Sequence, residues 1–206
     1  MAVETPNGVE FSPAAKVYLC ADRLVQTAGM YFGYPTPSGV KVDNRVLSKD
    51  VVLCTVQSLD ETGFIRVWQE ERKRLLGTEI QAIVRAVYSG APGFSGRFLE
   101  ATAWKDESLV TMLTRLIPVD QAPFIPFLDS ISEEFAAAGI LTRGGYGAHG
   151  NVWSSDWLAY LPDALYPEVY DLWMRAHSRP DAEVIKRNVM FAVAVRQRTE
   201  RDDFDD

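Results

Sequence analysis

The sequence is poor in the residue types that build most catalytic centres. It contains two histidines and two cysteines among 206 residues. No pair of them has the spacing of a zinc site, and two cysteines do not make a disulfide framework. Cys20 and Cys54 lie in apolar helical patterns, which predicts two small buried thiols and a reducing cytoplasm. We therefore expect no metal, no cofactor and no catalytic residues.

Long apolar runs and an excess of basic residues are also missing. No run approaches the roughly 20 apolar residues that span a bilayer, and the N-terminus shows no signal peptide pattern. Lysine and arginine total 21 against 28 acidic residues, for a net charge of −7. Binding to DNA or anionic lipid depends on lysine and arginine near phosphates. Such binding would need the basic residues to gather on one face.

Known catalytic motifs are lacking, with one apparent exception. The stretch "ILTRGGYGAHGNVW", residues 140–153, contains the pattern G-x-G-x-x-G. A dinucleotide site needs these glycines between a buried strand and a long helix, whereas here "ILT" and "NVW" look like two short strands. We expect a glycine-rich hairpin tip with Tyr146 and His149 exposed on it and Trp153 close by, as a contact for a protein partner or for membrane headgroups. The alternative is a flexible connection without a contact role.

The remaining sequence has the apolar content of a globular protein, at 47% hydrophobic residues. Its turn-forming residues and changes in composition divide it into five parts. These are a loose leader at 1–13, a first unit at 14–88, a linker at 89–97, a second unit at 98–198 and an acidic tail at 199–206. We expect the linker "YSGAPGFSG" to separate the units. The closing segments are helical, and Pro162 is expected to end one of these helices.

The two units share a pattern. In each, an apolar helix ends at a glycine, Gly63 or Gly139, and a β-rich segment follows. Strands "FIRVW" and "TEIQAIVRAV" flank the charged stretch "EERKRLLG", which we expect to be a loop. The sequence thus predicts a mainly α fold with short β-hairpins, arranged as tandem winged-helix-like halves.

Basic residues gather along the first predicted hairpin. The candidates for contact with an anion or anionic lipid are Arg66, Arg72, Lys73 and Arg74, with Arg85 nearby. The alternative interpretation is a solvated connection between the two strands, in which Glu70 and Glu71 balance the charge of the basic residues. The helices placed for DNA recognition carry one cation, Lys49, and several acids. DNA binding is therefore disfavoured, although a winged-helix regulator remains an alternative.

The run "DVVLCTVQSLDETGFIRVWQEERKRLLGTEIQAIVRA…SGAPGFSGRFLE" resembles the Golgi phosphoprotein family (GPP34 domain), as does the later "EEFAAAGILTR". The resemblance covers roughly residues 46–195. It implies a mainly α-helical adaptor that binds phosphatidylinositol 4-phosphate through a tryptophan and several arginines. Arg72, Lys73 and Arg74 match the basic stretch. The family's other arginines fall on Val52 and on the acidic helix "PFLDSISEEFAAAG", so the lipid site is not carried over.

Together these features predict a non-catalytic interaction or adaptor protein of the cytoplasm. We expect a protein partner, with anionic lipid or a phosphoinositide as a peripheral membrane contact through the basic residues. Two alternatives stay open. One is the DNA-associated winged-helix regulator, and the other is an enzyme whose site is assembled from residues far apart in the sequence.

Overall fold

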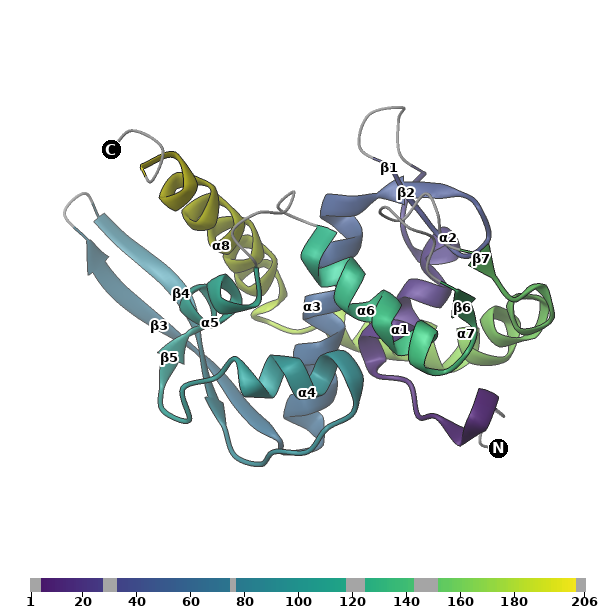
Figure 1. Ribbon diagram of the computed structural model, residues 1–206. Helices are drawn as coiled ribbons and strands as arrows, with labels where there is room; N and C mark the ends of the chain where they lie inside the picture. Colours follow the sequence, from purple (N-terminus) through teal and green to yellow (C-terminus); the bar gives the residue numbers. More distant parts are fainter. Residues whose placement is uncertain (1–4, 28–32, 75–76, 118–124, 143–151, 203–206) are drawn as a thin grey trace.

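A computed structural model describes residues 5–27, 33–74, 77–117, 125–142 and 152–202 of the chain. The fold is mainly helical with small antiparallel sheets, as the sequence predicts (Figure 1). A short 3₁₀ turn, Pro6–Gly8, precedes the first helix. The helices are α1 Pro13–Leu19, α2 Ala21–Leu24, α3 Asn44–Glu61, α4 Gly93–Glu100, α5 Leu109–Leu116, α6 Ile125–Ala137, α7 Ser155–His177 and α8 Ala182–Asp202. The strands are β1 Gly33–Pro35, β2 Lys41–Asp43, β3 Ile65–Arg74, β4 Gly77–Ala86, β5 Glu107–Ser108, β6 Leu141–Thr142 and β7 Val152–Trp153.

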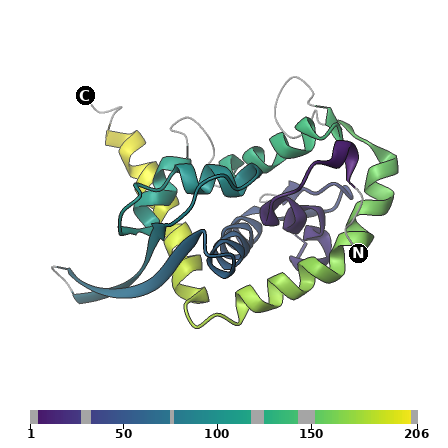
Figure 2. The ribbon, with the colours of Figure 1, turned by 90° about the horizontal axis from the view of Figure 1, so that it is seen from below.

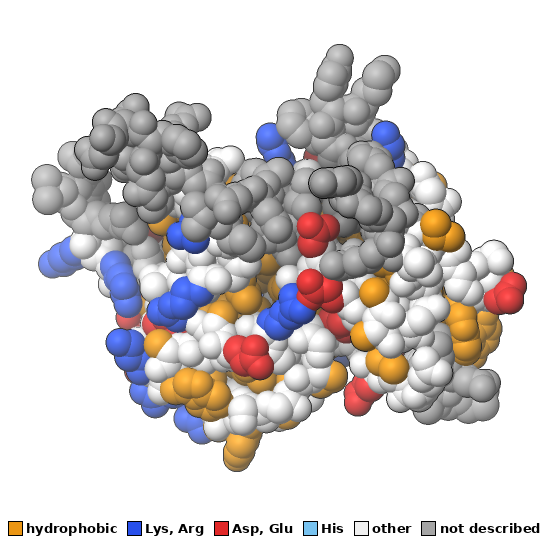
Figure 3. Space-filling model, viewed as in Figure 1, with side chains coloured by type: hydrophobic (Ala, Val, Ile, Leu, Met, Phe, Trp, Pro, Cys, Tyr) orange, Lys and Arg blue, Asp and Glu red, His pale blue; other side chains and the backbone are white. Residues whose placement is uncertain are grey.

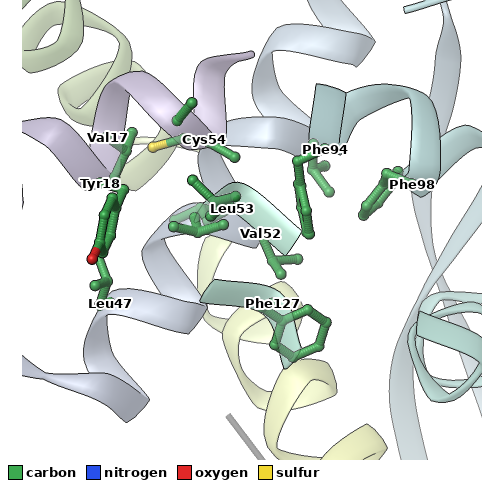
Figure 4. Packing of buried hydrophobic residues seen from close by; sticks show 14 of the residues in the cluster. Val17, Tyr18, Leu47, Val52, Leu53, Cys54, Phe94, Phe98 and Phe127 are labelled. Atoms are coloured by element: carbon green, nitrogen blue, oxygen red, sulfur yellow. The ribbon is translucent and has the colours of Figure 1, made fainter. Parts of the chain in front are cut away.

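Helix α3 lies at the centre of the fold and is seen nearly end-on in Figure 2, with other helices around it. The Asp43 carboxylate caps its first turn, accepting hydrogen bonds from the backbone N–H groups of Arg45 (2.8 Å) and Val46 (3.2 Å). The helix ends just before Gly63, whose φ of +76° is the left-handed conformation that glycine adopts without strain. Apolar side chains cover several faces of α3 and pack against α1, α4 and α6 (Figure 4).

One continuous core joins the two expected units. The leader at 1–13 is not loose throughout, because Phe11 is 2% exposed and its ring lies 5.4 Å from that of Phe135. The prediction of a linker over 89–97 is also wrong as a whole, since α4 begins at Gly93 and Phe94 is buried. Glycine, proline and serine content suggested a linker, but here these residues allow close packing at the start of a helix. The division near residue 90 is therefore not a boundary between separate cores.

The β3–β4 hairpin is longer than predicted. Strand pairing runs from Ile65↔Ala86 to Arg74↔Gly77, so residues 70–74 belong to β3 rather than to a loop. Their charges are compatible with a strand because both faces of this part of the ribbon meet solvent. A third strand, β5, pairs with β4 at Ile83 and Val84. It lies in the chain between α4 and α5.

Helix α8 covers the part of the β4 edge that β5 leaves open. The backbone N–H of Ala82 donates to Asn188 Oδ1 (3.1 Å), and Arg187 Nη2 donates to the carbonyl oxygen of Ile80 (2.9 Å). These contacts satisfy backbone groups that would otherwise form an open sheet edge. The helix continues to Asp202 and so extends into the segment expected to be an acidic tail.

The second glycine-terminated element is confirmed. Helix α6 is followed by Gly139, with a φ of +75°, and then by β6. Strands β6 and β7 pair antiparallel, with Leu141 opposite Trp153 and Thr142 opposite Val152. The glycine pattern at 145–150 lies outside the described residues, but the strands on either side of it are those of a hairpin. A dinucleotide site would instead place a helix directly after its glycines.

Helix α7 runs unbroken through two prolines, contrary to the helix end expected at Pro162. Pro162 and Pro167 both lie inside Ser155–His177. A proline has no N–H to donate to the carbonyl four residues earlier, and its ring crowds that carbonyl, so a helix bends there. Figure 2 shows α7 following a curved path around the molecule. Burial of Leu161, Leu165 and Val169 against the core holds the helix together across this region.

Candidate functional site

The β3–β4 hairpin projects from the helical body and carries the predicted basic residues (Figure 1). Arg66, Arg72 and Lys73 are all exposed, and Arg74 ends β3 opposite Gly77. Figure 3 shows lysine and arginine side chains along the margin of the molecule at the left of the view, where the hairpin lies. The structure thus places the predicted candidates on one prominent element.

These basic residues do not converge on one point. Side chains alternate along a strand, so Arg66 and Arg72 share one face of the ribbon and Lys73 lies on the other. The two arginines are six positions apart along the strand, which corresponds to about 20 Å. Glu70 stands between them on the same face, where its Oε1 accepts a hydrogen bond from Trp68 Nε1 (3.0 Å). The arrangement is a mixed-charge ribbon rather than a pocket for a single phosphate.

Arg85 does not add to a free basic patch. It lies directly across from Arg66 in the hairpin register and forms an ion pair with Asp106. Two guanidinium groups on neighbouring strands repel each other, and the carboxylate offsets that repulsion. Of the two arginines, Arg66 is therefore the one that is available to an external anion.

The outer edge of β3 exposes backbone groups. Ala82 N and Ile80 O point away from β3, toward α8. In an antiparallel ladder, the register partners of such residues point their own N–H and C=O groups to the opposite edge. Those partners are Gln69 and Glu71, and both residues are exposed. Within the described part of the chain, no hydrogen bond satisfies their backbone groups at this edge.

The predicted partner-contact loop is only partly described. Tyr146 and His149 lie outside the described residues. Trp153 does not stand out as a contact residue, because its ring packs inward, 5.4 Å from Phe135 and 6.2 Å from Tyr18 between centroids. Its place opposite Leu141 in the β6–β7 pair turns the side chain toward the core. Trp153 is therefore only partly accessible, and its role as a contact residue stays a prediction.

Both nitrogen atoms of the His177 ring are engaged. Nε2 lies 3.1 Å from Asp50 Oδ1, and Nδ1 lies 2.9 Å from the carbonyl oxygen of Trp173. Asp50 is buried in α3, and its other oxygen accepts from Trp173 Nε1 (3.2 Å). A general base needs one nitrogen directed at a substrate. The cluster instead ties α3 to α7, and among the described residues no group of three His, Cys, Asp or Glu side chains is placed to hold a metal ion.

Several acidic residues form hydrogen bonds or ion pairs that join separate segments of the chain. Glu134 is hydrogen-bonded to Ser12 and to the Phe94 backbone, and burial raises the pKa of its carboxyl. Asp60 pairs with Arg179 at 3.0 Å, and Glu61 with Arg175 at 2.9 Å. These pairs connect the end of α3 to α7 and to the turn before α8.

A cleft of about 460 Å³ was not predicted. It lies between the start of α1 with the segment before it, the end of α3, the loop that leads into α4 and the second half of α7. Its lining comes from four separate stretches of sequence, none with a recognisable motif. The only local signal was "APGFSG", whose glycines permit close packing beside the cleft.

No protein-family model, curated protein or solved structure matches the chain. Across the described residues, no helix has both the length and the apolar character needed to cross a bilayer. The fold and the site therefore define the class, which is a mainly helical protein with a projecting, mixed-charge β-hairpin.

Proposed function

We propose that this protein is a non-catalytic interaction or adaptor protein whose contact element is the β3–β4 hairpin. The observation that carries the proposal is the open outer edge of β3, where Gln69 and Glu71 direct backbone groups to solvent. An extended segment of a partner protein adds to such an edge by main-chain hydrogen bonding. The projecting ribbon gives a partner access without disturbing the core.

The side chains of the hairpin supply selectivity. Arg66, Arg72 and Lys73 attract acidic groups of the partner, while Glu70 and Glu71 disfavour a purely anionic surface. Charged residues on an edge strand also discourage uncontrolled pairing with other edges. An acidic, extended protein segment is thus the favoured occupant. The proposal has a second form, in which the same basic residues bind anionic lipid and hold the protein at the membrane surface.

The proposal includes a likeness to the Golgi phosphoprotein family and a tandem winged-helix-like arrangement. Its support is the repeated order of helix, glycine and hairpin, at Gly63 and again at Gly139. A cytoplasmic location belongs to the same proposal, supported by two cysteines that are free and buried. A DNA-reading role has less support, because α3 is buried on several faces.

The test uses a change confined to the open edge. Gln69→Pro removes an outward N–H without removing a hydrogen bond to β4, and proline is tolerated on an edge strand. Gln69→Ala is the matched control, since it keeps the N–H. Immobilised wild-type protein and the alanine variant are expected to retain the same partner from a lysate, identified by mass spectrometry, and the proline variant to lose it. Retention by all three proteins would argue against pairing at this edge.

The membrane form has its own test. Wild-type protein and a combined Arg66→Ala, Arg72→Ala, Lys73→Ala variant are compared by flotation with vesicles containing phosphatidylinositol 4-phosphate. Lipid contact predicts flotation of the wild type that weakens with salt and disappears in the variant. If neither protein floats, the contact is with protein alone. Equal flotation of both proteins would place any lipid contact elsewhere.

A further inference from the structure

Four side chains of mixed character follow one another along one face of β3. Side chains alternate along a strand, so Arg66, Trp68, Glu70 and Arg72 lie on the same face. The three charged residues are exposed, and Trp68 is half-buried. We refer to these four residues as the recognition row. A segment that pairs with the outer edge of β3 meets them in the order basic, aromatic, acidic and basic.

The hydrogen-bonding direction of β3 makes this row the part of the edge that a partner contacts most closely. Gln69 and Glu71 direct their backbone groups outward, so they form the hydrogen-bonded pairs with an added antiparallel strand. The row residues between and beside them then form the non-hydrogen-bonded pairs. Opposite Cα atoms in such pairs are about 4.5 Å apart, against about 5.5 Å in hydrogen-bonded pairs. Opposite side chains therefore interact most strongly along the recognition row.

The two arginines of the row keep their charge available on the side of the open edge. Arg66 lies opposite Arg85 in the hairpin, so its neighbour across β4 is a like charge. Arg72 lies opposite Glu79, but the Arg72 guanidinium forms no ion pair with any described residue. An acidic side chain on an added strand would lie directly opposite either arginine, on its other side. Opposite charges in that position stabilise strand pairing.

The two residues between the arginines call for different partners. Trp68 Nε1 donates to Glu70 Oε1 (3.0 Å), which fixes the indole and the carboxylate beside each other. Across the part of the chain that the structure describes, Glu70 has no ion pair, so its charge favours a basic residue opposite it. Trp68 lies opposite Ile83 in β4 and favours a β-branched or aromatic residue on its other side. The row thus has a different preference at each of its four positions.

We propose that the β3 edge selects an extended protein segment whose alternate residues are acidic, basic, apolar and acidic from its N-terminus to its C-terminus. The segment adds antiparallel, the more stable pairing per residue. Its first acidic residue then lies opposite Arg72, its basic residue opposite Glu70, its apolar residue opposite Trp68 and its last acidic residue opposite Arg66. This inference rests on the function proposed above, because it names the segment that the open edge accepts.

The experiment titrates the full-length protein with two synthetic peptides and follows the NMR shift of the Gln69 amide. The matched peptide is Thr-Asp-Thr-Lys-Thr-Val-Thr-Asp-Thr with both ends blocked. The exchanged peptide, Thr-Lys-Thr-Asp-Thr-Val-Thr-Asp-Thr, has the same composition and net charge. We expect the matched peptide to bind at least about fivefold more tightly, because the exchange turns two opposite-charge pairs into like-charge pairs. The difference should shrink as salt is added.

Two charge-exchange variants test the assignment of positions. Glu70→Arg combined with Arg72→Glu keeps the net charge of the protein and is expected to reverse the preference, so that the exchanged peptide binds at least about fivefold more tightly than the matched one. Glu71→Lys combined with Lys73→Glu makes a similar exchange on the other face of β3 and should leave the preference for the matched peptide in place. NMR spectra outside the hairpin show whether both variants keep the fold.

The Gln69→Pro variant separates failure of this inference from failure of the proposed function. If both peptides bind the wild type equally and the proline variant loses both, the edge pairs with extended segments but does not select this charge order. The inference then fails alone. It also fails alone if neither peptide binds up to about 5 mM while the proline variant loses the partner from the lysate. Undiminished binding of the matched peptide to the proline variant would contradict both.

Discussion

The carboxylate of Glu134 on α6 binds Ser12 at the start of α1 through two hydrogen bonds. Oε2 accepts from the Ser12 backbone N–H (3.0 Å), and Oε1 accepts from its hydroxyl (2.7 Å). Oε1 also accepts from the Phe94 backbone N–H at the start of α4 (2.6 Å). One side chain therefore joins three segments that are far apart in the sequence. The same contacts bring the N-terminal segment and α4 together beside the cleft.

Glu134→Gln is expected to destabilise the protein at neutral pH by about 1–3 kcal/mol, because an amide NH₂ faces backbone donors in place of an acceptor oxygen. Chemical unfolding of both proteins at pH 7 measures the difference. Glu133→Gln is the control, since Glu133 is a partly exposed partner of Arg97 and its loss should cost less than about 1 kcal/mol. An equal loss of stability for the two changes would mean that the hydrogen bonds of Glu134 to Ser12 and Phe94 do not stabilise the fold.

The stability difference between wild type and Glu134→Gln should depend on pH. Burial raises the pKa of Glu134 in the folded protein, against the lowering effect of its hydrogen bonds. The folded state thus takes up the proton at higher pH than the unfolded state. This group's contribution to stability is then largest below its unfolded pKa of about 4.3 and declines as pH rises through the folded pKa. Unfolding curves from pH 4 to 7 should show the wild-type advantage shrinking. An advantage that grows with pH would contradict the raised pKa.

Gly93→Ala is expected to destabilise the protein more than Gly63→Ala. Both glycines have positive φ, +54° and +76°. A Cβ at Gly93 would lie 2.2 Å from the Glu134 carboxyl carbon, whereas one at Gly63 meets no atom within 4 Å. Strained backbone affects both variants, and steric overlap affects only the first, which should add about 1–3 kcal/mol. Urea unfolding of the two variants measures that difference, and equal losses would rule out the close approach.

Arg115→Ala is expected to cost about 2–4 kcal/mol, because it leaves a buried carboxylate without its cation. Arg115 donates to Glu107 at 3.0 and 2.7 Å, and Glu107 is 6% exposed. Arg97→Ala removes a partner of Glu133 that is more accessible and should cost less than about 1 kcal/mol. Thermal and chemical unfolding compare the two variants. A similar cost for both would mean that burial of Glu107 does not matter.

Both cysteines are expected to be unreactive in the folded protein. Burial raises the pKa of Cys20 to about 12 and raises the pKa of Cys54 as well. Since the thiolate is the reactive form, neither thiol should react with Ellman's reagent at pH 8 until denaturant is added. Two thiols should then react. Rapid reaction of either cysteine under native conditions would show that its segment opens readily.

Local patterns predicted much of the secondary structure. The apolar spacing of Val52, Val56 and Leu59 identified α3, and Gly63 marked its end. Alternation in "TEIQAIVRAV" identified β4, and the short strands around the glycine pattern were also predicted. These signals succeed because helix ends and strand faces depend on residues close together in the sequence.

Features that depend on tertiary contacts were missed. The charged residues 70–74 looked like a loop because nothing nearby in the sequence shows that they pair with β4. Pro162 was expected to end a helix, but burial of the flanking apolar residues keeps α7 continuous. The hydrogen bonds of Glu134 were not predicted, because its donors, Ser12 and Phe94, come from distant segments. The cleft is lined by segments that are also far apart in the sequence, so no local sequence pattern predicted it.

Amide hydrogen exchange along β3 tests the central claim most directly. In the free protein, the N–H groups of Gln69 and Glu71 should exchange quickly at the open edge, while that of Glu70, directed at β4, should be protected. Addition of the partner retained by the wild type should slow exchange at Gln69 and Glu71. Protection of these two amides in the free protein, or unchanged fast exchange in the complex, would contradict the account.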